Sequence, residues 1–167
     1  MRLRSLVLVI TMLVVAVVLQ TTLFSQTTFF IPDLVMLVII VLALTRVSSE
    51  AVLVTAFFSG VVVDLLGSSV LGLRALVFTV VGYLALRTRD RADIGRVITG
   101  LWAGLVTLAG VVMLILIGTL FGQTVLLGEG VVERLVLVPL ANSILAVLFA
   151  PVMVRIIDRD ATAFRYT

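Results

Sequence analysis

The side chains that most often carry out chemistry are scarce in this chain, which contains no His, no Cys and no Lys, so that all twelve basic residues are arginine. Their absence excludes disulfides, thiol and Schiff-base catalysis, imidazole base catalysis and zinc sites built from His and Cys. The sequence also lacks a glycine-rich phosphate loop ending in Lys, a nucleophile elbow and an acid-rich array for magnesium. We therefore expect a protein that is not an enzyme and has no catalytic residue, no metal and no cofactor.

Charged residues near the ends of apolar segments are the remaining candidates for a functional site. A charge at the centre of a membrane helix costs about 2.5 to 3.5 kcal/mol on insertion scales, and less toward the membrane interface. Such charges are expected to be paired and to lie near a membrane surface. We predict an outer polar cluster that faces a partner and consists of Asp33, Asp64, Arg74, Glu133 and Arg134, with Glu129 in the same layer.

Asp64 and Arg74 lie on either side of a short turn near Ser68, at similar depths on two antiparallel segments. This placement favours an ion pair that closes the hairpin, and a polar site presented to a partner or ligand is the alternative. Asp33 directly follows Pro32, and an acid in the first turn of a helix interacts favourably with the helix dipole. Glu133 and Arg134 are neighbours in the sequence, so we expect them to point to different sides of a helix.

Membrane helices are the elements that must position these charges, because 62% of the residues are hydrophobic and only 13% are charged. An ordinary soluble domain is about half apolar and about a quarter charged. The predicted fold is therefore an all-α, polytopic membrane protein with a single domain over residues 1–167. Its six transmembrane helices are expected at residues 5–24, 32–45, 50–66, 70–86, 96–121 and 131–157.

Arginine alternates between the connections of these helices. The connections at residues 25–31, 67–69 and 122–130 contain no arginine. By the positive-inside rule, both termini and the arginine-rich connections are cytoplasmic. The net charge of +3 does not indicate a nucleic-acid partner, because the basic residues stand between apolar runs and form no groove-reading motif. Ten arginines lie on the predicted cytoplasmic side: Arg2, Arg4, Arg46, Arg87, Arg89, Arg91, Arg96, Arg155, Arg159 and Arg165.

Two of the predicted helices have unusual lengths. Residues 32–45 would reach only about 21 Å at 1.5 Å per residue, which is short of a hydrocarbon core of about 30 Å. This helix is expected to be partial, sheltered by its neighbours, or set in a thinned bilayer. The last helix is long and contains Pro139 and Pro151, so tilt or kinks are expected there.

Small residues recur at the four-residue spacing that lets helices approach closely. The pairs are Gly100 with Gly104, Gly118 with Gly122, and Ala146 with Ala150. They indicate either packing within one bundle, which a six-helix protein needs first, or a seam for a second copy or another protein. Packing within one bundle is the favoured interpretation, and the seam is the alternative.

Several motifs resemble the family of bacterial rod shape-determining proteins MreD. The most specific is the run Gly60-x-x-x-Asp64-Leu65-Leu66 within residues 58–68, followed by Leu71-Gly72-Leu73. The run at residues 31–34, Arg46 and the run at residues 82–84 add to the resemblance, which covers roughly residues 1–157. The chain departs mildly from the family at residues 68–70, where relatives commonly have further Gly or Pro.

This resemblance implies a non-enzymatic scaffold of the cell-elongation complex in the bacterial inner membrane. The implied partners are MreC, the peptidoglycan synthase RodA with a class B penicillin-binding protein, possibly MreB, and membrane lipids. The family is also similar in architecture to the substrate-binding subunits of energy-coupling-factor transporters. A substrate-binding subunit for a vitamin-type small molecule is therefore the alternative function.

Overall fold

The computed structural model describes residues 3–22, 32–67, 70–91, 95–123 and 130–162. All elements in these ranges are helices. In chain order they are α1 (Leu3–Thr22), α2 (Leu34–Leu42), α3 (Ser49–Leu66), α4 (Leu73–Thr88), the 3-10 helix η1 (Arg89–Arg91), α5 (Arg96–Leu120) and α6 (Val131–Thr162). The prediction of an all-helical fold is confirmed for the described residues, and the helix bounds lie within three residues of the predicted segments except at the end of α6, which extends five residues further.

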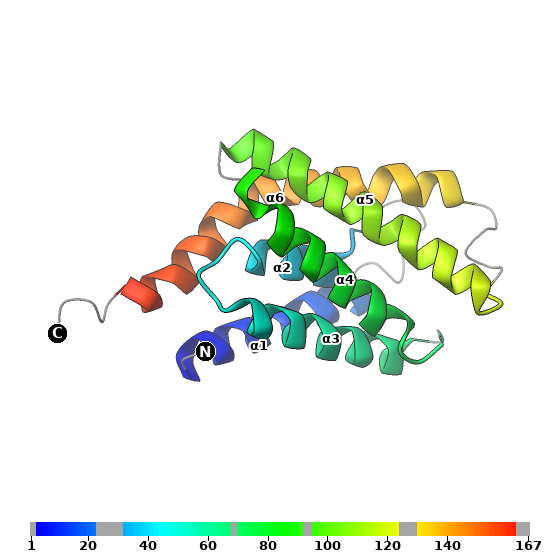
Figure 1. Cartoon of the computed structure of the whole chain (residues 1–167), viewed down its shortest axis with the longest axis horizontal. Coiled ribbons are helices and arrows are strands. Elements are labelled where there is room, and N and C mark those ends of the chain that lie inside the picture. Colours follow the sequence, from blue (N-terminus) through cyan, green and yellow to red (C-terminus); the bar gives the residue numbers. More distant parts are fainter. Residues whose placement is uncertain (1–2, 23–31, 68–69, 92–94, 124–129, 163–167) are drawn as a thin grey trace.

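The helices form one bundle around α2, which packs against each of the other five α-helices (Figure 1). Helix α5 packs mainly against α6, and α3 packs mainly against α4. One end of the bundle, here called the Asp33 end, contains the last turns of α1, α3 and α5 and the first turns of α2, α4 and α6. The opposite end, here called the Arg46 end, contains the start of α1 and the end of α6 (Figure 1).

Three described helices are long and apolar enough to cross a membrane, namely Ser49–Leu66, Arg96–Leu120 and Val131–Asp158. Helix α6 remains continuous through Pro139 and Pro151, although each proline removes one backbone N–H group from the helix. Helix α2 has nine residues and is therefore only about 14 Å long. It is a partial helix sheltered by its neighbours, and six full crossings remain a prediction.

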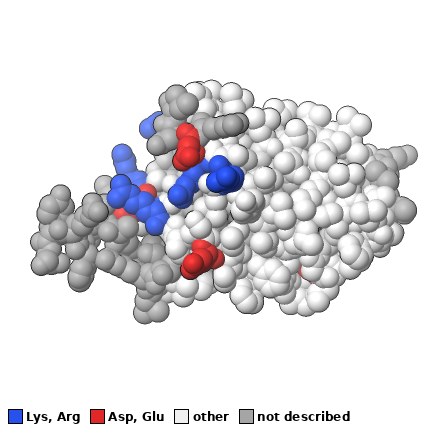
Figure 2. All heavy atoms as spheres, in the orientation of Figure 1, with Lys and Arg blue, Asp and Glu red and all other residues white. Residues whose placement is uncertain are grey.

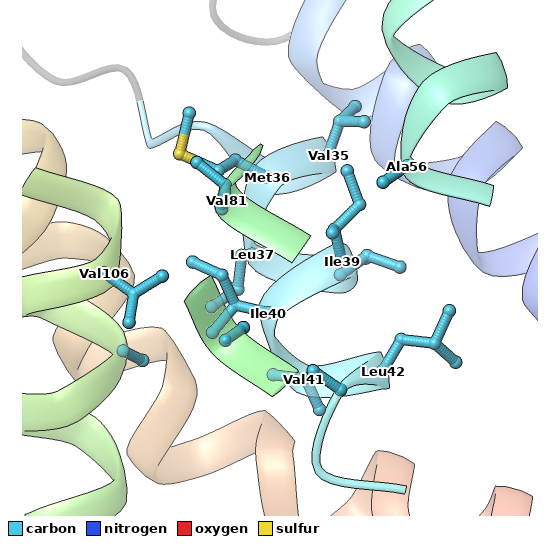
Figure 3. Close-up of a cluster of buried hydrophobic side chains, with 14 of the residues drawn as sticks. Val35, Met36, Leu37, Ile39, Ile40, Val41, Leu42, Ala56, Val81 and Val106 are labelled. Carbon is cyan, nitrogen blue, oxygen red and sulfur yellow. The ribbon is translucent and has the colours of Figure 1, made fainter. Parts of the chain in front are cut away.

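The side chains of α2 form the centre of the core. Eight of its nine residues are buried, from Val35 to Leu42. Figure 3 shows them pointing in several directions toward the surrounding helices, including Ala56 of α3, Val81 of α4 and Val106 of α5. A helix that is apolar on all sides is stable only where it is surrounded on all sides. The apolar sequence of α2 therefore explains why it lies inside the bundle and not along its surface.

Both ends of α2 have hydrogen-bond partners within the protein. At the start, the carboxylate of Asp33 accepts the backbone N–H of Met36 at 3.0 Å. At the end, the carbonyl oxygen of Leu42 accepts the hydroxyl of Thr45 at 2.7 Å and the backbone N–H of Thr45 at 3.1 Å. Non-helical backbone at membrane depth is tolerated only where protein or water satisfies it. These contacts allow a helix to begin and end inside the bundle.

Glycines account for the close approach of α5 to α6. A Cβ atom at Gly100 would lie 2.3 Å from a side-chain atom of Val147, and one at Gly104 would lie 3.1 Å from Cβ of Ser143. The hydroxyl of Ser143 donates to the carbonyl oxygen of Gly100 at 2.8 Å. Gly100 and Gly104 thus face α6 of the same chain, and Gly118 is buried as well.

Gly122 has a different role from the other glycines of this series. It has a φ of 80° and a Cβ atom there would meet nothing within 4 Å. The backbone N–H of Gln123 donates to the carbonyl oxygen of Gly118 at 2.8 Å, and that of Gly122 donates to Thr119 at 3.0 Å. This is a Schellman motif, in which glycine supplies the left-handed residue that ends the helix. Gly122 therefore terminates α5 at the Asp33 end.

Candidate functional site at the Asp33 end

The carboxylate of Asp64 caps helix α4, although Asp64 belongs to α3. Its Oδ2 atom accepts the backbone N–H groups of Gly72 at 2.9 Å, Arg74 at 3.0 Å and Ala75 at 3.4 Å. Gly72 is the cap residue of α4 and has no side chain, so the first N–H groups of α4 need an acceptor from elsewhere. Asp64 provides this acceptor and is only 2% exposed.

Gly60 allows Asp64 to reach α4. A Cβ atom at Gly60 would lie 2.4 Å from the Cα atom of Ala75, so the backbones of α3 and α4 touch at this point. Residues four apart lie on the same face of a helix, one turn from each other. Gly60 therefore brings α4 close to α3, and Asp64 caps α4 one turn later. This geometry explains the Gly-x-x-x-Asp spacing of the motif.

Arg74 connects the first turns of α4 and α2. Its Nη1 atom lies 3.8 Å from Oδ2 of Asp33, with 28% of the Arg74 side chain and 12% of the Asp33 side chain exposed. We expected an ion pair between the side chains of Arg74 and Asp64. The contacts that the structure shows are a hydrogen bond from the backbone N–H of Arg74 to Asp64 and an ion pair from its guanidinium group to Asp33. Arg74 thus joins both acids, each through a different group.

Asn142 is a residue of this region that our sequence analysis missed. It lies on α6, is fully buried, and donates from Nδ2 to the carbonyl oxygen of Asp33 at 3.1 Å and to the hydroxyl of Thr107 at 3.3 Å. Its Oδ1 atom has no hydrogen-bond partner among the described residues. Asn142 is the only asparagine in the sequence and stands within an apolar run. A single amide side chain within an apolar run is the feature of the sequence that could have predicted this buried polar contact.

A cavity of about 650 Å³ opens at the Asp33 end between these helix ends. Its polar lining comes from the side chains of Arg74, Arg134, Gln20 and Gln123. The Oε1 atom of Gln20 is buried and has no hydrogen-bond partner within the described part of the chain. The remaining lining is largely apolar and comes from helices α1 to α5 and the residues that follow α3 and α5: Val17, Thr21, Val35, Val63, Leu66, Gly67, Leu73, Leu114 and Gly122.

The structure brings four of the five predicted site residues to one region. Three of them contact one another, and the fourth lines the cavity. Asp33, Asp64 and Arg74 form a connected group, and Arg134 lines the cavity next to Arg74 without an ion pair to a described residue. Glu133 is exposed in the first turn of α6 and does not line the cavity. Glu129 lies outside the described residues. The cavity thus presents guanidinium and amide groups, which bind carboxylates and carbonyl oxygens.

The chemistry of this region is that of binding. Its carboxylates accept backbone N–H groups or an arginine, and the described residues contain no group of three or more side chains that could hold a metal ion. A partner that enters the cavity would meet Arg134 as its most accessible charge. The site therefore favours recognition of a polar or acidic segment.

Comparison with known proteins identifies a family. No curated protein and no solved structure matches the chain. The model of the family described as rod shape-determining protein MreD matches residues 1–158, which is nearly the whole chain. On this match, and with an all-helical bundle that contains three apolar helices long enough for a membrane, the chain belongs to the MreD family of rod shape-determining proteins.

Proposed function

We propose that this protein is a non-enzymatic scaffold of the cell-elongation complex, which binds MreC in the bacterial inner membrane and supports peptidoglycan synthesis. Membership of the MreD family supports a role in rod shape determination. The observation that carries the finer proposal is the cavity at the Asp33 end, where Arg134 has no ion pair with a residue of the described ranges. RodA with its class B penicillin-binding protein, and possibly MreB, would join the complex through or beside MreC.

The surface of the bundle favours a partner that also lies in the membrane. Large apolar side chains are exposed along α3 and α5, among them Phe58 at 62%, Leu105 at 66% and Leu116 at 61%. Such surfaces contact lipid or the membrane helix of a partner. A protein with one membrane helix followed by a domain outside the membrane, as we expect for MreC, would place the segment after its helix at the mouth of the cavity.

Placement of the Asp33 end outside the cytoplasm is part of this proposal. Because the chain has no cysteine, single cysteines are clean probes of topology. A cysteine at Gln123 should react in intact spheroplasts with a thiol reagent that does not cross the membrane. A cysteine at Ser48 should react only after the membrane is opened. If Ser48→Cys were labelled from outside, the proposed orientation would be wrong and the Asp33 end could not contact a periplasmic segment of MreC.

Co-purification tests the partner directly. The tagged chain should be extracted from its native membrane in mild detergent, and the eluate analysed by mass spectrometry for proteins and small molecules. Recovery of MreC and the elongation synthases is the expected result. If MreC is present in the membrane but absent from the eluate, the scaffold proposal is refuted. Recovery of a tightly held vitamin with an ATPase module would identify a transporter subunit.

Two neighbouring variants test the role of the cavity. Arg134→Gln removes the guanidinium group that lines the cavity, whereas Glu133→Gln changes a charge in the same turn of α6 outside the lining. We expect Arg134→Gln to reduce MreC recovery about fivefold, as for the loss of one exposed ion pair of about 1 kcal/mol, and Glu133→Gln to leave recovery unchanged. Equal recovery with both variants would place the contact with MreC elsewhere.

A further inference from the structure

A second hollow, of about 500 Å³, lies at the Arg46 end of the bundle. It is bounded by the connection between α2 and α3, by η1, by the start of α5 and by the second half of α6. Figure 2 shows charged side chains gathered toward this end, while most of the described surface in that view is uncharged. The hollow is lined by Leu44, Thr45, Arg46, Arg89, Asp90, Gly95, Arg96, Thr99, Ala146, Ala150, Pro151 and Val154.

Three arginines from three different elements converge on this hollow. The guanidinium groups of Arg46, Arg89 and Arg96 form no ion pair with a carboxylate in the described ranges of the chain. Asp90 also lines the hollow, so its lining residues carry three positive charges and one negative charge, and the carboxylate of Asp158 lies behind Arg46. The connection that carries Arg46 is held against α6, because its backbone N–H donates to Oδ1 of Asp158 at 2.9 Å. Positive charges held close together in this way favour a bound anion.

The start of α5 opens into the same hollow. Gly95 is the cap residue of this 25-residue helix and offers no side-chain acceptor to the first N–H groups. A Cβ atom at Gly95 would meet nothing within 4 Å, so no described residue closes this helix start on the side of the cap. These N–H groups and the positive end of the helix dipole add to the attraction that the three arginines exert on an anion.

The rest of the lining is apolar and suits a chain of methylene groups. Ala146 and Ala150 are buried small residues of α6, and Pro151 and Val154 continue the same wall. Beyond this wall, Leu148 and Val152 of α6 are exposed to the surroundings of the bundle. A free phosphate ion would use only the arginine-rich rim. A phospholipid would use the rim for its phosphate and the wall for its acyl chains.

We propose that this hollow binds an anionic phospholipid, with the headgroup phosphate between Arg46, Arg89 and Arg96. This inference rests on the orientation proposed above, which places the Arg46 end on the cytoplasmic side, where the leaflet carries anionic lipids and basic pockets between membrane helices suit their headgroups. The site is separate from the cavity at the Asp33 end and does not depend on MreC. It would fix the height and orientation of the bundle in the membrane through a lipid instead of a protein partner.

The single tryptophan of the chain provides the measurement. Trp102 lies on α5, one turn after the lining residue Thr99, and its Nε1 donates to the hydroxyl of Thr88 at 2.9 Å. The full-length protein is reconstituted in mixtures of phosphatidylglycerol and phosphatidylcholine. In one series only the phosphatidylglycerol is brominated, and in the other only the phosphatidylcholine is brominated. Quenching of Trp102 gives the relative affinity of the two lipids. We expect phosphatidylglycerol to be preferred about tenfold.

Matched pairs of variants separate a site from general surface charge. Arg46→Gln with Arg96→Gln removes two charges from the hollow, and Arg87→Gln with Arg155→Gln removes two charges that do not line it. The first pair should abolish the preference, the second should retain it, and Arg89→Gln alone should reduce it partly. Arg89→Gln also keeps the test valid if the first pair does not fold. Equal loss in both pairs, or no preference in the unmodified protein, would overturn the proposal.

Inorganic phosphate distinguishes a lipid from a free anion. Millimolar phosphate should leave the preference unchanged relative to sodium chloride of equal ionic strength, because it lacks the acyl chains that contact the apolar wall. Complete displacement by phosphate at that concentration would assign the hollow to a soluble phosphate and refute the lipid.

Discussion

The Asp33 end and the Arg46 end of the bundle use charged residues in opposite ways. At the Asp33 end, Asp64 is buried and accepts backbone N–H groups of α4, and Asp33 caps α2 and pairs with Arg74. At the Arg46 end, Arg46, Arg89 and Arg96 are exposed around a hollow and have no ion pair to a described carboxylate. Charges at the first end mainly hold helices together, whereas these three arginines at the second end are available to bind an anion.

The largest effect on stability is expected at Asp64. Replacing it with alanine leaves the first turn of α4 without its acceptor, in a place that water does not reach freely. We expect Asp64→Ala to lower the free energy of unfolding by about 2 to 4 kcal/mol, measured as a loss of thermal stability in detergent. Asp64→Asn retains an oxygen acceptor and should lose less. If Asp64→Ala were as stable as the unmodified protein, the charges at the Asp33 end would not stabilise the bundle more than those at the Arg46 end.

Gly60 should show the next largest effect. Gly60→Ala places a Cβ atom 2.4 Å from backbone atoms of Ala75, so α3 and α4 must move apart. We expect a loss of about 1 to 3 kcal/mol, as for other overpacked contacts. Gly82→Ala is the matched control on α4, because its Cβ would lie 3.4 Å or more from side chains only. Similar losses for the two variants would argue against a specific contact at Gly60.

A double-mutant cycle sharpens the assignment of Arg74. We expect Asp33→Asn and Arg74→Gln to couple by about 0.5 to 1 kcal/mol, because the ion pair is partly exposed and therefore screened. Asp64→Asn and Arg74→Gln should couple more weakly, since Gln at position 74 keeps the backbone N–H that Asp64 accepts. Thermal unfolding of the four proteins of each cycle gives the two coupling energies. The reverse order would mean that the Arg74 side chain pairs with Asp64.

The smallest effect on stability is expected at the Arg46 end. Arg46→Gln with Arg96→Gln changes exposed side chains that hold no described partner, so the free energy of unfolding in neutral detergent should change by less than about 0.5 kcal/mol. Anionic detergent should stabilise the unmodified protein more than this variant. A large loss in neutral detergent would show that these arginines, like the charges of the Asp33 end, hold the helices together.

The sequence predicted the helices better than the contacts of the site. Apolar runs bounded by charges set the helix positions, and the short second run already indicated a partial helix. Matching depth across the turn near Ser68 brought Asp64 and Arg74 to the same level. The depth of two residues in the membrane does not determine which of their atoms are in contact, however. The absence of a side chain at Gly60 lets the backbones of α3 and α4 touch, so that Asp64 reaches the backbone of α4. The role of Asn142 depends on how α6 packs against α2, which no local pattern encodes.

The burial of α2 has a consequence for how the protein is made. With nine residues, α2 is too short to be held in a bilayer by its own length, and it touches helices on both sides of it in the chain. The carbonyl oxygen of its cap residue Asp33 accepts the backbone N–H of Leu37 and also a hydrogen bond from Asn142, which the ribosome adds only with α6. The centre of the bundle is therefore completed after synthesis of its last helix. Chains truncated before α6 should be recognised by membrane proteases as unassembled, even where their long helices are already inserted.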